Sequence, residues 1–350
     1  MSPSLLLYCR AGFEGECAQE IEAGAHAAGI AGKPRFDNGA GFVVFAADAA
    51  ESALRDAVRW RDLVFARQSL IAFAHLPKLA RNDRATPILA ALRGRGEKFG
   101  EIWTEAPDSD AGKQLAPLCK SFGNALVGAL KKAQLLDPQA RRRLHVFFPQ
   151  GDEVYLCASD PDAVAPWPQG IPRLKFPREA PSRSTLKLEE AFAVLLDEGE
   201  RARWLKPGMT AVDLGAAPGG WTWQLVRRSI RVTAVDNGPM DRALLDSGLV
   251  SHRREDGFRY RPPKPVDWLV CDMVEQPRRV ADLVAHWLEQ GWCSRAIFNL
   301  KLPMKKRFEE TARCLAQIRA GARVVRAKQL YHDREEITVF AASAARRQTP

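Results

Sequence analysis

Short apolar runs and longer amphipathic stretches alternate along the first part of this chain. Residues 5–9 and 41–45 are apolar runs of strand length, whereas residues 13–26 and 47–58 have the composition and spacing of helices. This pattern predicts a small α+β unit over residues 1–60.

The pattern then restarts and predicts a second domain over residues 61–160. Its expected elements are an apolar run at residues 63–66, a helix over 86–92, a strand over 101–105, a helix over 111–135 and strands over 144–148 and 154–157. The turn Gln150-Gly151-Asp152 separates the last two strands, so we expect them to pair as a hairpin.

Prolines mark a linker over residues 161–182. Positions 161, 166, 168, 172, 177 and 181 are proline, which rules out a continuous helix or a central strand. The second half of the linker is basic, and the linker also contains the aromatic residues Trp167 and Phe176. This composition suits binding to RNA phosphates and stacking on unpaired bases. An extended linker that packs its aromatic side chains on the next domain explains the same composition.

Strands and helices alternate again over residues 183–350. Ser184 and Thr185 can cap a helix with one apolar face. The later predictions are strands over residues 209–214, 232–235, 266–272, 296–300, 324–330 and 336–340, with helices over 280–290 and 308–318. This order predicts an α/β fold, a mostly parallel sheet with one antiparallel edge strand.

Composition limits the class of protein. The 350 residues suffice for two or three domains, and the 46% apolar content is ordinary for a globular chain. No apolar run approaches the roughly 20 residues of a membrane span, so we expect a cytoplasmic protein that does not bind membranes. Seven scattered cysteines without a C-x-x-C pair predict reduced core thiols and no metal site. The net charge of +10 favours a polyanionic partner, although it also serves solubility.

A glycine-rich turn follows the strand predicted over residues 209–214. It has the order Asp213-Leu-Gly215-Ala-Ala217-Pro218-Gly219-Gly220-Trp221. Glycines let a ligand approach bare backbone, and the acid about 20 residues later, Asp236, can accept hydrogen bonds from ribose hydroxyls. The alternative is a strand-turn-helix corner whose glycines are incidental.

Two features of this turn disfavour a dinucleotide. The spacing is not Gly-x-Gly-x-x-Gly, and Pro218 removes an N–H donor that a pyrophosphate would need. The carboxylate of Asp213 would repel a phosphate but suits a ligand with ammonium and sulfonium charges. We therefore expect S-adenosylmethionine as the cofactor.

Charged residues end several predicted strands. Asp213, Asp236, Asp272 and Lys301 each close an apolar run, and the carboxyl ends of parallel strands gather catalytic groups at one edge of a sheet. Four charged residues at strand ends are stronger evidence for a functional site than a single acid in a loop.

Methylation of a ribose hydroxyl requires a base. A lysine can be that base if its pKa falls from about 10.4, through desolvation or a second cation nearby. We expect Lys187 to be the second cation for Lys301, and Asp272 and Glu336 to orient the two lysines.

These four residues carry a family resemblance. Lys187, Asp272, Lys301 and Glu336 occur in the order and context of the K-D-K-E tetrad of FtsJ-like ribose 2′-O-methyltransferases. The chain resembles one member of that family over nearly its whole length. The similar segments are residues 9–18, 172–177, 182–192, 235–240, 254–258, 299–307 and 331–336. The resemblance implies a ferredoxin-like plus THUMP RNA-binding region before a Rossmann-like methyltransferase domain at residues 183–350.

The resemblance also implies the reaction and the site. The implied reaction is methylation of the 2′-hydroxyl of one cytidine in the peptidyl transferase region of 23S rRNA, with Lys301 as proton acceptor and S-adenosylhomocysteine as product. Ala217 departs from the cysteine expected in relatives, and we choose Glu336 over Glu335 because the tetrad acid directly precedes the last strand. The candidate cofactor site is Ser184, Asp213, Gly215, Ala217, Pro218, Gly219, Gly220, Trp221, Asp236, Asp256 and Asp272.

The expected partner is 23S rRNA or a precursor of the large subunit, bound by a monomer. The candidate RNA contacts are Arg141, Arg142, Arg143, Arg173, Lys175, Arg178, Arg183, Lys305 and Lys306. A solvated basic face is the alternative for the cluster at residues 141–143.

Three other functions have distinct requirements or outcomes. A methyltransferase for a base amine should carry Asn/Asp-Pro-Pro-aromatic where this chain has Asp272-Met-Val-Glu275. A cytosine carbon-5 enzyme needs a cysteine nucleophile, and Cys271 should point to the opposite sheet face from Asp272, into the core. An RNA-binding protein with a relict cofactor pocket would transfer no methyl group.

Overall fold

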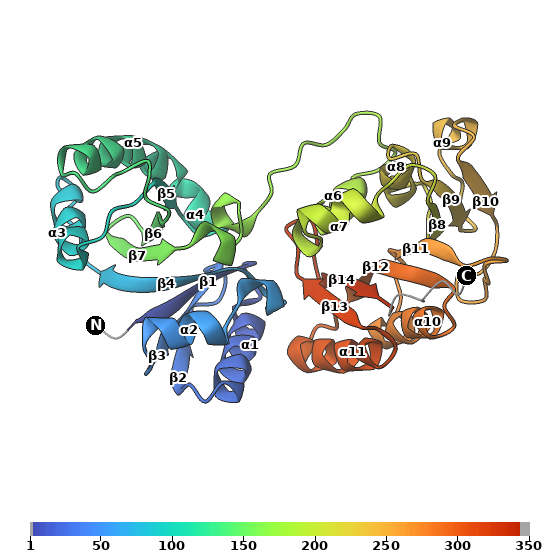
Figure 1. The fold of residues 1–350 in the computed structure, drawn as a ribbon, viewed down its shortest axis with the longest axis horizontal. Coiled ribbons are helices and arrows are strands. Elements are labelled where there is room, and N and C mark those ends of the chain that lie inside the picture. The colour runs from blue at the N-terminus through green and yellow to red at the C-terminus, as the bar shows by residue number, and fades with distance from the viewer. Residues whose placement is uncertain (1–2, 344–350) are drawn as a thin grey trace. The chain divides into compact units, whose positions relative to one another are not determined.

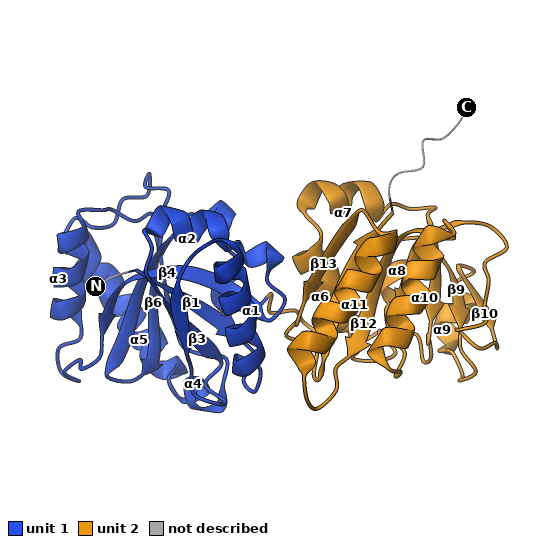
Figure 2. Ribbon diagram, turned by 90° about the horizontal axis from the view of Figure 1, so that it is seen from below, with its two compact units in different colours: residues 1–171 blue, residues 172–350 orange. Residues whose placement is uncertain are grey.

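The computed structural model describes residues 3–343, and the chain divides into two compact units between Ile171 and Pro172 (Figure 2). We call them unit 1 and unit 2 and describe each by itself. Over the described range, no helix has the length and apolar character needed to cross a membrane. All seven cysteines are buried, as expected for core thiols.

Unit 1 is built on one continuous sheet in the order β2-β3-β1-β4-β7-β6-β5, in which only β5 and β6 are parallel neighbours among the described strands. The strands are β1 (Ser4–Cys9), β2 (Gly32–Arg35), β3 (Phe42–Ala47), β4 (Ala66–Leu76), β5 (Glu101–Glu105), β6 (Arg143–Gln150) and β7 (Glu153–Ser159). The regions predicted at residues 1–60 and 61–160 share this sheet, because β4 pairs with β1 on one side and with β7 on the other.

Helices pack on both halves of this sheet (Figure 1). They are α1 (Glu14–Ala27), α2 (Glu51–Ala57), α3 (Ala85–Arg95), α4 (Asp110–Gln114) and α5 (Ala116–Lys132). The single helix predicted over residues 111–135 is thus wrong. Pro117 lies in the first turn of α5, where its ring is tolerated, but inside a longer helix it would clash with the preceding turn and remove a hydrogen bond.

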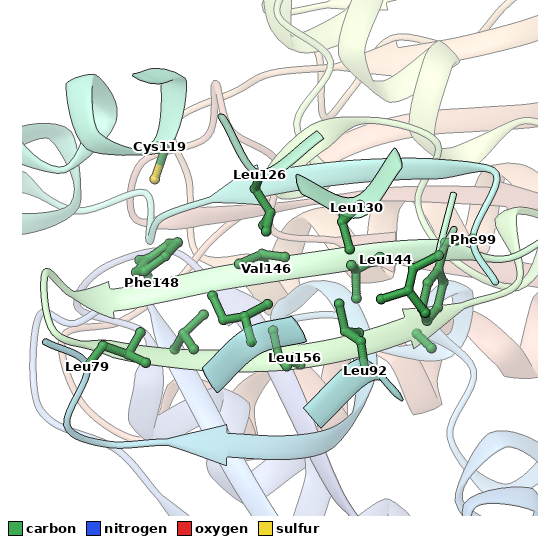
Figure 3. Packing of buried hydrophobic residues seen from close by; sticks show 14 of the residues in the cluster. Leu79, Leu92, Phe99, Cys119, Leu126, Leu130, Leu144, Val146, Phe148 and Leu156 are labelled. Carbon is green, nitrogen blue, oxygen red and sulfur yellow. The ribbon is translucent and has the colours of Figure 1, made fainter. Parts of the chain in front are cut away.

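Alternating residues of β6 and β7 form a core with α3 and α5. Leu144, Val146 and Phe148 point to the same face of β6 because strand side chains alternate. Figure 3 shows Leu126 and Leu130 directed at this face, and all five side chains are buried. These side chains are part of one apolar cluster between the sheet and the two helices.

The proline-rich segment is divided between the two units. The side chain of Gln68 holds both backbone groups of Ala165, accepting from its N–H at 3.1 Å and donating to its carbonyl at 3.2 Å. The N–H of Gln169 donates to Glu105 at 2.6 Å. Residues 161–171 are therefore packed into unit 1, and the extended part of the segment begins at Pro172.

Unit 2 has the predicted α/β fold, with a sheet in the order β10-β9-β8-β11-β12-β14-β13. Its described strands are β8 (Thr210–Leu214), β9 (Arg231–Val235), β10 (Val250–Arg253), β11 (Val266–Cys271), β12 (Cys293–Lys301), β13 (Val324–Lys328) and β14 (Glu336–Ala342). The first five strands in this order are parallel. From β8 the chain adds β9 and β10 on one side and then β11 and β12 on the other. Ligands are expected at the carboxyl ends of the strands where the strand order reverses in this way.

Helices cover both faces of this sheet, with α10 and α11 on one side and α6 and α8 on the other (Figure 1). The helices are α6 (Thr185–Leu195), α7 (Glu198–Trp204), α8 (Gly220–Val226), α9 (Arg242–Asp246), α10 (Pro277–Glu289) and α11 (Arg307–Gly321). Ser184 precedes α6 but its side chain makes no capping hydrogen bond, contrary to our expectation.

The antiparallel strand lies one place inside the edge, which corrects the predicted edge strand. It is β14, between β12 and β13. Every residue of β14 is buried, whereas the first three residues of β13 are only half-buried. The more apolar strand therefore takes the interior position.

Candidate active site

Two lysines and two acids meet at the carboxyl ends of β11 and β12. Lys301 Nζ lies 2.8 Å from Asp272 Oδ1 and also contacts Glu336 Oε2. Lys187 Nζ lies 3.2 Å from Asp272 Oδ2 and 2.5 Å from Glu336 Oε1. Each lysine thus contacts both carboxylates, and the four charges alternate around a closed ring.

Strand register explains why these residues meet. Lys301 ends β12 and Glu336 begins β14, and they are direct cross-strand partners. Asp272 directly follows Cys271, which is aligned with Phe298 of the neighbouring parallel strand. Three of the four residues are therefore positioned by the sheet itself.

Lys187 comes from the first turn of α6, where the helix dipole disfavours a cation. Asp272 and Glu336 supply the compensating negative charge. These ion pairs hold the first turn of α6 at the carboxyl ends of the strands.

The expected depression of the Lys301 pKa is wrong for this arrangement. Burial lowers the pKa, but the attraction of Asp272 and Glu336 outweighs it, so the pKa of Lys301 is raised from its ordinary value. The repulsion expected from Lys187 is offset because that lysine contacts the same two carboxylates. Lys301 therefore carries a proton at neutral pH and must lose it before it can act as a base.

A second layer of polar side chains lies beneath the ring. Asn299 Nδ2 donates to Asp272 Oδ1 at 2.9 Å, and the hydroxyl of Thr338 lies 2.8 Å from Asn299 Oδ1. Asp333 contacts that hydroxyl at 3.0 Å and accepts from the N–H of Leu330 at 2.9 Å. Asn299, Thr338 and Asp333 are all buried. The sequence pattern did not predict this layer, although Asn299 and Asp333 lie within the segments that are similar to the family.

The glycine-rich turn lies between β8 and α8. Gly215 and Gly219 have φ of +76° and +119°, which disfavour a side chain. A Cβ on Gly220 would lie 2.1 Å from Ser184 Oγ, so the turn packs directly against the start of α6. This brings Ser184 to the turn, as the candidate site requires.

Asp236 fastens the turn to β9. Its two carboxylate oxygens accept from the N–H of Ala217 at 3.0 Å and of Gly238 at 2.7 Å. A carboxylate held at the turn in this way fits recognition of ribose hydroxyls, because each oxygen keeps a further lone pair. The turn and this acid therefore suit a nucleoside cofactor.

Asp213 lies deeper than the rest of the cofactor site. It is fully buried, and Thr222 Oγ1 donates to it at 2.6 Å. Burial first, and then repulsion from Asp272 and Asp236, raise its pKa to about 7 despite the hydrogen bond. Its negative charge is thus costly, and a cationic ligand group nearby would stabilise it.

The remaining cofactor candidates lie on either side of this turn. Asp256 is exposed, and its carboxylate accepts from the N–H of Phe258 at 2.9 Å. The next residue, Gly257, approaches the side chain of Met273, beside Asp272. Trp221 follows the turn directly and is buried in the first turn of α8.

The arginine cluster of unit 1 is largely occupied by carboxylates. Arg141 pairs with Asp160 and Asp162, and Arg142 with Glu97. The side chain of Arg143 is only 10% exposed and pairs with Glu101. Arg143 is therefore part of the packing of the sheet, whereas Arg141 remains open to solvent.

The predicted RNA contacts in unit 2 are all exposed. Those of the extended segment are Arg173, Lys175, Arg178 and Arg183. The guanidinium of Arg183 stacks over Phe176 at 5.6 Å. Lys305 and Lys306 follow β12, at the same end of the strand as Lys301.

Two exposed apolar side chains follow the same strand ends, and we did not predict them. Val274 is 90% exposed shortly after β11, and Met304 is 82% exposed shortly after β12. An apolar side chain in an otherwise polar loop was the available signal. They are candidates for contact with a nucleobase.

Cys271 is fully buried on β11, as expected. Burial raises its pKa to about 12, so it is a thiol rather than a nucleophilic thiolate. Cysteine-based chemistry is therefore disfavoured at this site.

Comparison with known proteins gives consistent matches along the chain. Three family models match in succession: the RlmM ferredoxin-like domain at residues 1–70, the N-terminal region of ribosomal RNA large subunit methyltransferase M at residues 83–160, and FtsJ-like methyltransferase at residues 180–333. Among solved structures, the match with TrmN from Thermus thermophilus covers 97% of this chain and 99% of that one, with 16% identity and a TM-score of 0.38.

Two curated relatives are similar to nearly the whole chain. Both bear the name ribosomal RNA large subunit methyltransferase M. The protein from Xanthomonas oryzae pv. oryzae (strain PXO99A) is 57% identical over 343 residues, and that from Xanthomonas campestris pv. campestris (strain B100) is 57% identical over 344 residues. Each match covers 96% of this chain and 98% of the relative.

Proposed function

Because this chain belongs to the ribosomal RNA large subunit methyltransferase M family and is an S-adenosylmethionine-dependent methyltransferase, we propose that it methylates a ribose 2′-hydroxyl of 23S rRNA. The family resemblance stated from the sequence is thereby confirmed. The proposed acceptor is one cytidine in the peptidyl transferase region.

The ring of Lys187, Asp272, Lys301 and Glu336 is the observation that carries the proposal. A hydroxyl needs a base as it attacks the methyl carbon, whereas a ring nitrogen already has a lone pair to offer. Two lysines shared between two carboxylates provide a base together with the groups that orient it. A site for an already nucleophilic atom would have no use for this arrangement.

Each residue has a distinct role in the proposal. Bound S-adenosylmethionine supplies the methyl group from a sulfonium and leaves as S-adenosylhomocysteine. Lys301, once neutral, accepts the proton of the 2′-hydroxyl and becomes an ammonium group again, while Lys187 shares the two carboxylates with it. Asp272 and Glu336 fix both lysines, and the turn at residues 215–220 with Asp236 holds the nucleoside part of the cofactor.

The basic residues would bind the RNA. We propose that Arg173, Lys175, Arg178 and Arg183 contact phosphates, because they are exposed on an extended segment of unit 2. Lys305 and Lys306 follow Lys301 on the chain and would hold the nucleotide near the reaction. Unit 1 would select the RNA, as expected for a ferredoxin-like plus THUMP region, and a monomer acting in the cytoplasm on 23S rRNA or its precursor would suffice.

Replacement of Lys301 tests the assignment. Wild type, Lys301→Ala and the exposed control Lys206→Ala are incubated with labelled S-adenosylmethionine and unmodified 23S rRNA. We expect transfer by the wild type and by Lys206→Ala, none by Lys301→Ala, and similar cofactor affinity for all three. Wild-type turnover by Lys301→Ala would refute the role of that lysine. Absence of transfer by the wild type would favour a non-enzymatic RNA-binding protein.

A further inference from the structure

The side chains beneath the tetrad form an unbroken line. Asn299 and Thr338 are direct cross-strand partners on β12 and β14, two residues inward from Lys301 and Glu336 respectively. Residues two apart on a strand face the same side, so this pair lies directly below the ring. Asp333 closes the line from the loop between β13 and β14. Two residues further inward, the side chains on this face are apolar, because Ile297 is paired with Phe340.

The direction of each hydrogen bond along this line follows from the charged end. Asp272 accepts from Lys301 on one oxygen and from Lys187 on the other, so neither oxygen carries a proton. The contact with Asn299 must then come from its Nδ2 group, and Asn299 Oδ1 faces Thr338. An amide oxygen only accepts, so the hydroxyl of Thr338 must donate to it.

This assignment uses the only proton of the Thr338 hydroxyl. Thr338 Oγ1 also lies 3.1 and 3.0 Å from the two oxygens of Asp333. Since the hydroxyl has no second proton, Asp333 must be the donor to Thr338. A carboxylate cannot donate, whereas a carboxylic acid can. One oxygen of Asp333 is also engaged as acceptor from the N–H of Leu330, at 2.9 Å, which leaves the other to carry the proton.

We propose that Asp333 is a neutral carboxylic acid and a positioning residue, whose proton sets the direction of the hydrogen bonds through Thr338 and Asn299 and thereby holds Asp272 in place for the lysines. An ionised Asp333 would turn the hydroxyl of Thr338 toward itself. Asn299 Oδ1 would then lose its donor, and Asp272 would lose a fixed partner.

The surroundings of Asp333 favour the neutral form. It is 1% exposed, and burial followed by repulsion from Glu336 and Glu190 raises its pKa well above the ordinary value. Lys187 is the cation that opposes this shift.

The loop that carries Asp333 is itself firmly held. Glu190 of α6 accepts from the N–H groups of Tyr331 and His332 at 2.8 and 2.9 Å. Glu190 also contacts His332 Nδ1 at 2.6 Å, so it holds the loop at three points. Asp333 is therefore kept in contact with Thr338.

Three variants separate a proton donor from a simple structural group. In Asp333→Asn, an amide N–H replaces the acid proton and the amide oxygen still accepts from Leu330, so we expect turnover within a few-fold of wild type. Asp333→Ala and Thr338→Val break the line, and we expect their turnover to fall roughly 10- to 100-fold with unchanged affinity for S-adenosylmethionine. Turnover in Asp333→Asn as low as in Asp333→Ala would overturn the proposal.

The turnover measurements rest on the proposed function, whereas a second measurement, of the protonation of Asp333, does not. The carboxyl carbon of Asp333 in the full chain, labelled with ¹³C and assigned by its loss in Asp333→Asn, reports protonation directly by NMR. We expect the signal of a protonated acid at neutral pH, while the exposed carboxylate of Asp246 gives that of an ionised group. An ionised Asp333 would overturn the proposal even if the wild type methylates RNA. A protonated Asp333 in a wild type that transfers no methyl group would instead reject the proposed function alone.

Discussion

Replacing Glu336 with glutamine should move the pH dependence of methyl transfer to lower pH. Glu336 is 5% exposed and contacts both lysines, so the substitution changes the formal charge of the ring from zero to +1. The raised pKa of Lys301 depends in part on attraction to Glu336. Without that attraction, the neutral amine should form at lower pH.

The size of the shift follows from the geometry. Two unit charges about 4 Å apart interact by about 4 kcal/mol at an effective dielectric constant near 20, which corresponds to roughly three pKa units. Lys301 is 23% exposed, and Asp272 remains beside it. Solvent screening therefore reduces the expected shift to about one to two units. Each unit raises the fraction of neutral Lys301 about tenfold on the acid side of its pKa.

Single-turnover rates at saturating cofactor and RNA measure this shift. The rate of the wild type should rise with pH from neutral into the alkaline range, because Lys301 must first lose a proton. The same rise should occur at lower pH in Glu336→Gln, even though its limiting rate is reduced by poorer orientation of the lysines. Asp246→Asn, which removes an exposed carboxylate, should leave the profile unchanged. A Glu336→Gln profile that is unmoved, or moved to higher pH, would refute the reasoning.

Three further substitutions test other parts of the site. Gly219→Ala should weaken S-adenosylmethionine binding about tenfold, since a positive φ costs a side chain roughly 1–2 kcal/mol and its Cβ would lie 2.3 Å from Leu244. Titration calorimetry checks this, with Gly248→Ala, at φ +71° and open space, as the control that should bind normally. Asp213→Asn should stabilise unit 2 by up to about 4 kcal/mol above pH 7, because the pKa of Asp213 is raised to about 7 in the folded chain. That raised pKa favours the folded state at acid pH and ceases to do so as pH rises, so denaturant unfolding should show no gain for the variant at acid pH. Met304→Ala should raise the KM for RNA without changing cofactor affinity, whereas Leu245→Ala, also exposed, should change neither; equal effects of both would remove Met304 from the RNA surface.

The sequence predicts the parts of the site that lie at strand ends. Lys301 and Glu336 each border an apolar run, and the glycine-rich turn follows another, so their positions follow from pattern alone. The short strands β2 and β10 are not predictable in this way, because alternate residues are exposed and neither has an apolar run. β14 is recognisable as a strand from its apolar run, but its position between β12 and β13 depends on packing.

The second layer and the protonation of the ring depend on tertiary contacts. Asn299 and Thr338 look like ordinary strand residues until their register is known, and Asp333 looks like a loop acid. The sequence suggested two neighbouring lysines and hence a lowered pKa for Lys301. The opposite direction emerges because each lysine contacts both carboxylates, a feature of geometry rather than of spacing.

The position of the transferred methyl group tests the central claim most directly. Unmodified 23S rRNA is labelled by the wild-type chain with S-adenosylmethionine and then digested to nucleosides. A single labelled product, cytidine methylated on the ribose 2′-oxygen, is the predicted result, and the methylated link should resist alkaline cleavage because the free hydroxyl that drives it is blocked. Label on a base, whether on a ring atom or an exocyclic amine, would contradict the proposed reaction and the role of Lys301 as the base.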